Sequence, residues 1–96
     1  MLDGVKIMVG GEEMTLPHLN WRSVKRFFKD ITGGALDDPD RAIDLMPEML
    51  LEALVRNYPE ITQAELEDRM TPGEMLAAIP KLLEVSGFTR VAAGEA

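Results

Sequence analysis

The chain has 96 residues, of which 46% are hydrophobic and 28% charged; it contains no cysteine and has a formal net charge of −7. This length fits one domain with a modest core, and the composition argues against wholesale disorder. The lack of cysteine excludes disulfides and cysteine-ligated metals, and the acidic balance disfavours general binding to nucleic acids. No apolar run approaches the roughly 20 residues of a membrane span, and the first residues lack the pattern of a secretory signal. We therefore expect a soluble, intracellular protein.

Residues 4–17 are expected to form a β-hairpin. Two runs of alternating apolar residues flank a glycine pair, and the residues of the apolar face are Val5, Ile7, Val9, Met14 and Leu16. Gly10 and Gly11 supply the positive φ angles that a tight two-residue turn requires. Because an isolated hairpin is only marginally stable in water, this one must pack against other elements.

A first helix is predicted over about residues 20–32. Asn20 would be its N-cap, and Gly33-Gly34 would stop it. Its apolar positions at helical spacing are Trp21, Val24, Phe28 and Ile31, with Phe27 beside them.

A second helix is expected over about residues 38–57. Asp38 and Pro39 favour its start, because an aspartate caps a helix and proline suits the first turn. Its apolar stripe consists of Ile43, Met46, Leu50 and Leu54, widened by Met49 and Ala53. Pro47 interrupts this stripe, so the segment is either one kinked helix or two helices that break near Met46.

Two shorter helices are predicted over about residues 62–69 and 72–86, each preceded by a threonine that can begin a capping box. Pro80 should bend the last helix, whose apolar face includes Met75, Leu76 and Ile79. Residues 89–96 are expected to form a flexible C-terminal tail. The predicted fold is mainly α: an N-terminal β-hairpin followed by about four helices in a small bundle, as a single domain of residues 1–88.

The sequence contains no constellation of residues that predicts an enzyme. Its one histidine, His18, and the nearby Ser23 lack a third partner for nucleophilic catalysis. A calcium loop that began at Asp38 would need glycine and glutamate where Ile43 and Met49 stand. No phosphate-binding loop is present. We therefore predict a non-enzymatic protein without a cofactor.

Two charged stripes are candidate contact surfaces. The basic stripe, on the first helix, consists of Arg22, Lys25, Arg26 and Lys29. The acidic stripe, on the second helix, consists of Asp40, Asp44, Glu48 and Glu52. Like charges at these spacings repel, so each stripe could bind a partner of opposite charge. The alternatives are that both stripes are solvated, or that they pair with each other within a chain or between subunits.

The chain is also rich in methionine, with seven residues. Flexible thioethers fill irregular cores, and they also line surfaces that accept varied apolar partners. The candidates for an apolar docking groove are Met46, Met49, Met70 and Met75, which lie near expected helix breaks.

A family resemblance rests on the order of turn and cap residues along the chain. They are Gly10-Gly11, Leu16-Pro17, Leu19-Asn20, Arg56-Asn57-Tyr58-Pro59, Ile61-Thr62, Glu65-Leu66 and Ser86-Gly87. In this order, over about residues 4–88, the chain resembles the small tail assembly chaperones of long-tailed bacteriophages.

The resemblance implies a non-enzymatic protein in the cytoplasm of the bacterial host. There it would hold the tape-measure protein while tail tube subunits polymerise, with the tail tube protein and a second copy of the chain as further candidate partners. The first alternative is a structural virion component, such as a minor tail or head–tail connector protein. The second is a small regulatory domain that reads nucleic acid through the basic stripe.

Overall fold

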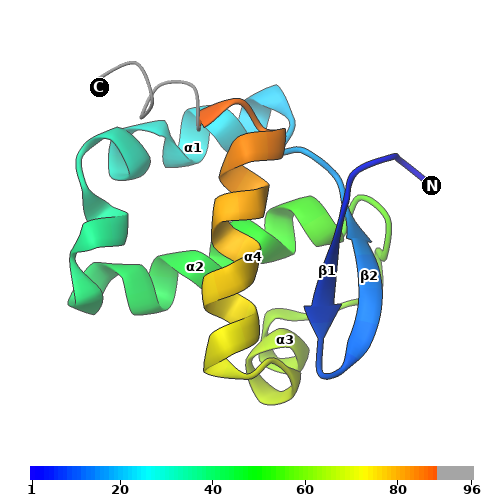
Figure 1. Ribbon diagram of the computed structural model, residues 1–96. Helices are drawn as coiled ribbons and strands as arrows, with labels where there is room; N and C mark the ends of the chain where they lie inside the picture. The colour runs from blue at the N-terminus through cyan, green and yellow to red at the C-terminus, as the bar shows by residue number, and fades with distance from the viewer. Residues whose placement is uncertain (89–96) are drawn as a thin grey trace.

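The computed structural model describes residues 1–88, which form a β-hairpin followed by four α-helices and one short 3-10 helix (Figure 1). The elements are β1 (Val5–Val9), β2 (Glu12–Leu16), α1 (Trp21–Thr32), η1 (Ala35–Asp37), α2 (Pro39–Leu54), α3 (Gln63–Arg69) and α4 (Pro72–Val85). The predicted fold class is thus confirmed, although α2 ends before the expected residue 57. The predicted tail, residues 89–96, lies outside the described residues. Within residues 1–88, no helix is both long and apolar enough to cross a bilayer.

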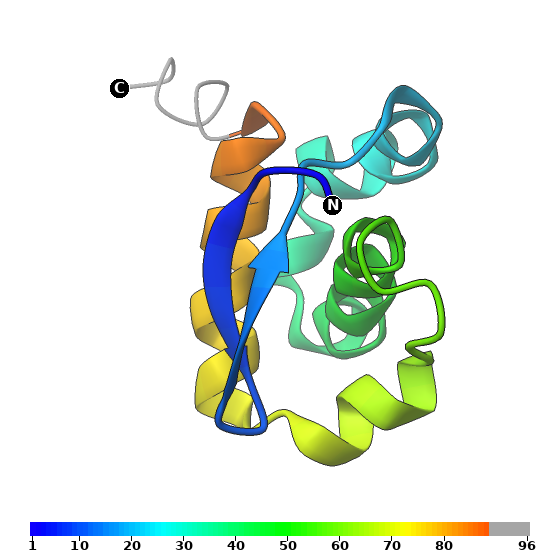
Figure 2. The same cartoon turned by 90° about the vertical axis from the view of Figure 1, so that its right-hand side faces the viewer.

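The hairpin is antiparallel, and Ile7 pairs with Met14 near its centre. Its turn uses Gly10 and Gly11 with φ angles of 60° and 83°, a region that costs other residues energy. β1 lies between β2 and α4 (Figures 1 and 2). The apolar side chains of the sheet, Ile7, Val9, Met14 and Leu16, are buried in the core. On the other edge, the Tyr58 hydroxyl accepts a hydrogen bond from the backbone N–H of Thr15 at 2.9 Å. Other parts of the chain therefore contact both edges of the hairpin.

Each helix begins at a polar cap that the sequence indicated. Asn20 Oδ1 accepts from the Ser23 backbone N–H at 2.9 Å at the start of α1. Thr71 and Glu74 form a reciprocal capping box at the start of α4. Pro47 and Pro80 lie inside α2 and α4, and neither interrupts its helix. The alternative of two helices that break near Met46 is therefore wrong.

One hydrophobic cluster unites the hairpin with all four α-helices. Its completely buried side chains include Val9, Leu16, Met49, Leu50, Leu54, Leu66 and Leu82. α1 contributes Phe27, which is buried, whereas Trp21 and Phe28 are 75% and 48% exposed. Of the four apolar positions at helical spacing, Val24 and Ile31 pack against the core, whereas Trp21 and Phe28 do not, because Ser23 and Phe27 face inward.

Candidate partner-binding groove

An open apolar groove lies where the first half of α2, the end of α3 and the beginning of α4 meet. Its cavity volume is about 390 Å³. The apolar residues that line it are Ile43, Met46, Pro47, Leu66, Met70, Pro72, Met75 and Leu76, together with the polar Glu67 and Thr71. We call this site the methionine groove.

The short link between α3 and α4 shapes the methionine groove. α3 ends at Arg69, Met70 and Thr71 adopt extended backbone angles, and Pro72 starts α4 in the first helical position. This sharp change of direction places Met70 and Met75 on the same opening.

Two large apolar side chains on the rim of the methionine groove face solvent. Ile43 of α2 is 68% exposed and Leu76 of α4 is 64% exposed. Single exposed apolar residues are ordinary, but here two of them border one apolar opening, which is typical of a contact surface.

Three of the four predicted methionines meet at this site. Met46, Met70 and Met75 come from different segments and line the same groove. Met49 does not: its side chain is completely buried in the core, so its assignment to a docking surface is corrected. At 3.6 residues per turn, Met49 lies almost a full turn after Met46. Its side chain nevertheless faces the hydrophobic core rather than the outer face of α2. The sequence pattern placed Ile43 in the apolar stripe of α2 and did not indicate that it lies exposed on the rim of the groove.

The methionine groove has one charged side chain among its lining residues, and that side chain is acidic. Glu67 lines the groove from α3, and no lysine or arginine is among its lining residues. Asp40 and Asp44 of α2 do not line this groove; they line a separate cleft together with Asp30 and Ala35. A partner that fits this site would combine an apolar face with a cation opposite Glu67.

The two charged stripes meet at one point. Arg26 of the basic stripe forms ion pairs with Glu52 at 3.2 Å and with Glu48 at 3.6 Å, both from the acidic stripe. The buried Ser23 hydroxyl also donates to Glu52, at 2.7 Å. Of the alternatives, pairing within the chain is observed for these residues. The remaining members form no ion pair with any residue in 1–88; they are Arg22, Lys25, Lys29, Asp40 and Asp44.

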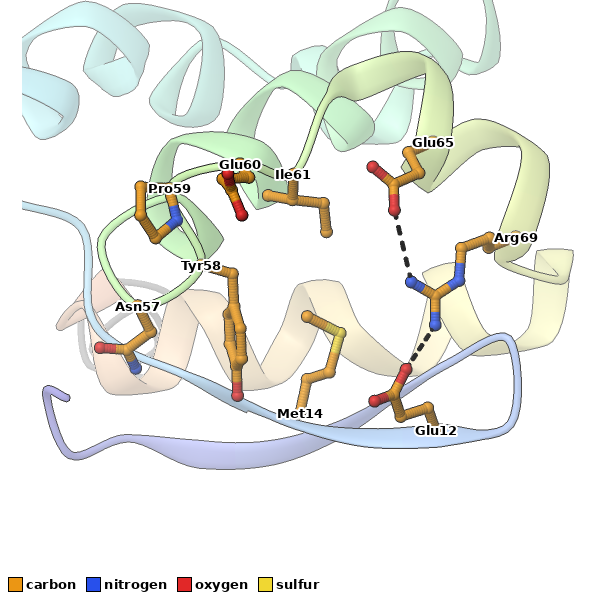
Figure 3. A pocket seen from close by; sticks show the side chains of 9 residues that line it. All are labelled: Glu12, Met14, Asn57, Tyr58, Pro59, Glu60, Ile61, Glu65 and Arg69. Carbon is orange, nitrogen blue, oxygen red and sulfur yellow. Dashed lines mark hydrogen bonds and ion pairs between the residues drawn. The ribbon is translucent and has the colours of Figure 1, made fainter.

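A second, polar cleft of about 430 Å³ lies between β2, residues 57–61 and α3 (Figure 3). Its main polar feature is Arg69, whose guanidinium contacts Glu12 at 2.6 Å and Glu65 at 3.7 Å. Arg69 also donates to the backbone carbonyl of Val9 at 3.3 Å. Through these contacts Arg69 of α3 is joined to the hairpin at Val9 and Glu12.

His18 and Ser23 do not approach each other as a catalytic pair. His18 Nδ1 lies 2.8 Å from the carbonyl oxygen of Leu19, and the Arg56 guanidinium donates to the carbonyl of His18. Ser23 instead bonds to Glu52. Among the residues that the structure describes, no group of three or more histidine or acidic residues is placed to hold a metal ion.

Comparison with known proteins adds no assignment: no family model, curated protein or solved structure matches this chain.

Proposed function

We propose that this chain is a phage tail assembly chaperone, a non-enzymatic protein that holds the tape-measure protein in the bacterial cytoplasm during tail tube assembly. The methionine groove carries the proposal, because an open apolar site bordered by Glu67 suits a helix of a client protein. The resemblance in turn and cap residues supports the choice of client.

The chemistry of the groove matches a long helical client. A tape-measure protein carries apolar stripes that stay uncovered until the tube encloses them. An apolar side chain of such a stripe could enter between Met46, Met70 and Met75, whose flexible thioethers adapt to different shapes. Burial of one leucine-sized side chain stabilises a complex by only about 1.5–3 kcal/mol. Single contacts are thus weak, and many copies on one long client act through avidity.

The test is binding between the purified chain and the tape-measure protein of the same phage, measured after co-expression and by titration with helical segments of that protein. Leu76→Glu places a charge on the groove rim at a largely exposed position, so the fold should survive. We expect this variant to bind much less of the tape-measure protein than wild type does. Met8→Glu is the matched control, because Met8 is also an exposed apolar residue but lies on β1, outside the groove.

Equal client binding by wild type and Leu76→Glu would show that the groove is not the binding site. No binding of the tape-measure protein by wild type, combined with the presence of the chain in purified particles, would overturn the chaperone proposal in favour of a structural virion component.

A further inference from the structure

Three of the chain's seven methionines line the methionine groove, and each of the three is only half-buried. Met46, Met70 and Met75 border one open cavity of about 390 Å³. By contrast, Met49 and Met14 are 0% and 7% exposed in the core. Because oxidation of sulfur follows exposure, a small water-soluble oxidant can meet the three groove sulfurs in the folded protein but not the two core sulfurs.

A methionine sulfur that meets hydrogen peroxide becomes a sulfoxide. The sulfur donates an electron pair to one peroxide oxygen, the O–O bond breaks, and the products are the sulfoxide and water. The sulfur loses two electrons and the peroxide gains them. Methionine sulfoxide reductases reverse the step: two thiols become a disulfide, the oxygen leaves as water and the thioether returns.

The methionine groove offers little to satisfy the oxygen that this reaction adds. A sulfoxide oxygen is a polar acceptor, and among the side chains that line the groove only the Thr71 hydroxyl can donate a hydrogen bond. The carboxylate of Glu67 accepts only, and the other lining side chains are apolar. Each sulfoxide in the groove therefore depends on water, and an apolar partner that seals the groove would remove that water.

We propose that the methionine groove is a redox-controlled binding site. Peroxide converts Met46, Met70 and Met75 to sulfoxides, the oxidised groove rejects apolar partners, and reduction of the sulfoxides restores it. The control resides in the sulfur atoms and not in apolar character alone, because Leu66 and Leu76 line the same groove and contain no sulfur.

Two exposed methionines outside the groove provide an internal control. Met1 and Met8 are 86% and 43% exposed, and neither lines the groove. Peroxide should oxidise both of them readily. Because they lie elsewhere, their oxidation should leave binding in the groove unchanged.

The effect on a client rests on the proposed function, whereas the oxidation of the groove does not. If a helix of the tape-measure protein fills the groove, it should shield the three sulfurs from peroxide, and prior oxidation should prevent its binding. Oxidation and the affinity of the groove for an apolar dye are both measured on the purified chain without a client. The two proposals can therefore fail separately.

The first experiment locates the oxidation. The folded chain is treated with hydrogen peroxide, the reaction is stopped with free methionine, and tandem mass spectrometry of peptides gives a rate for each methionine. We expect the three groove methionines to react within about tenfold of the rate of Met8. Met14 and Met49 should react at least about tenfold more slowly than the groove methionines, because solvent does not reach them.

The second experiment measures binding in the groove with Nile red, a neutral apolar dye whose fluorescence rises in apolar surroundings. The part of the signal that Leu76→Glu abolishes comes from the groove, since Leu76 lines it. We expect the oxidised wild type to bind this dye about tenfold more weakly than the reduced protein, as for an apolar contact that covers an unpaired polar group. Treatment with methionine sulfoxide reductases and dithiothreitol should restore the affinity.

A triple variant removes the groove sulfurs and keeps nearly the same apolar volume: Met46→Leu, Met70→Leu and Met75→Leu. It should bind the dye equally before and after peroxide. The matched control, Met1→Leu combined with Met8→Leu, should stay as sensitive to peroxide as wild type. Circular dichroism and thermal unfolding establish whether each sample is folded.

Four results would overturn the proposal: groove methionines that react as slowly as Met49, no dye binding that depends on Leu76, oxidised wild type that binds the dye as before or has unfolded, and a triple variant that loses the dye after peroxide. A reduced chain that shows the expected dye binding but no client would refute the proposed function alone. Equal client binding by the reduced and oxidised chains would refute the redox control and leave the proposed function standing.

Discussion

The side-chain carboxylate of Glu74 accepts a hydrogen bond from the backbone N–H of Gly10 at 2.9 Å, although 64 positions separate the two residues. It also accepts from the backbone N–H groups of Gly11 at 3.0 Å and Thr71 at 2.9 Å. One carboxylate thus caps α4 and holds the hairpin turn against it. The donors, first Thr71 and then Gly11 and Gly10, hold the pKa of Glu74 below the usual value for a glutamate.

The first prediction is that Glu74 makes folding sensitive to acid. Because the pKa of Glu74 is lower in the folded state than in the unfolded chain, its ionised form stabilises the fold. This stabilisation is fully present above the unfolded pKa, about 4.5, and is lost as the pH falls through the folded value. We expect Glu74→Gln to lower the melting temperature at pH 7 and to differ less from wild type at pH 3.

Glu84→Gln is the control for that experiment, since Glu84 lies on α4 but its side chain forms no hydrogen bond with the described residues. Melting curves from pH 7 to pH 3 should show little change for this variant. A constant difference between Glu74→Gln and wild type over the whole range would contradict the assigned role of the carboxylate.

The second prediction concerns the hairpin turn. An alanine at Gly11, where φ is 83° and the space is open, should cost about 1–2 kcal/mol for the left-handed backbone alone. Gly10→Ala should cost more, because its Cβ would also lie 3.1 Å from the carbonyl oxygen of Arg69. Urea unfolding of the two variants measures the difference. Equal losses would mean that the turn moves away from α3 without cost.

The hairpin, the caps and most helix limits, though not the end of α2, could be predicted because local chemistry determines them. Gly10-Gly11 selects the turn, and residues such as Asn20 and Thr71 satisfy the first backbone N–H groups of their helices. The orientation of α1 could not be predicted in this way. Apolar residues cover more than one side of this helix, so spacing allows either Phe27 or Phe28 to face the core.

A tertiary contact decides the orientation of α1. The Ser23 hydroxyl meets Glu52 of α2, 29 residues away, and Phe27 enters the core beside it. The methionine groove was predictable only in part for a similar reason. Met46 and Met49 both lie near Pro47 in the sequence, but the packing of α3 and α4 against α2 determines which of them reaches the surface.

The third prediction separates these two methionines. Met49→Ala removes a completely buried side chain and should lower the free energy of unfolding by about 2–5 kcal/mol. Met46→Ala, at the groove, should cost about 1 kcal/mol or less, because solvent can fill the space. Urea unfolding measures both values. A joint change of Met46 and Met49 would therefore test folding rather than binding, and similar losses for the two single variants would contradict the assigned burial.

The fourth prediction compares two contacts between α1 and α2: the Ser23–Glu52 hydrogen bond and the Arg26–Glu48 ion pair. Ser23 is buried and donates to Glu52 at 2.7 Å, so Ser23→Ala loses a hydrogen bond to a charged group. The loss should be about 1–2 kcal/mol, after the better helix propensity of alanine offsets part of it. Glu48→Gln removes only an exposed ion pair with Arg26, at 3.6 Å, and should cost less than about 1 kcal/mol.

Salt distinguishes the two contacts further. The effect of Glu48→Gln should vanish in 1 M sodium chloride, where the screening length is about 3 Å, because both partners face solvent. The effect of Ser23→Ala should persist, since its hydroxyl is shielded from the solvent. Denaturation in urea at low and high salt gives both values. If Glu48→Gln were the more costly change at every salt concentration, the exposed ion pairs rather than the buried hydroxyl would hold α1 in its observed rotation and keep Trp21 on the outer face.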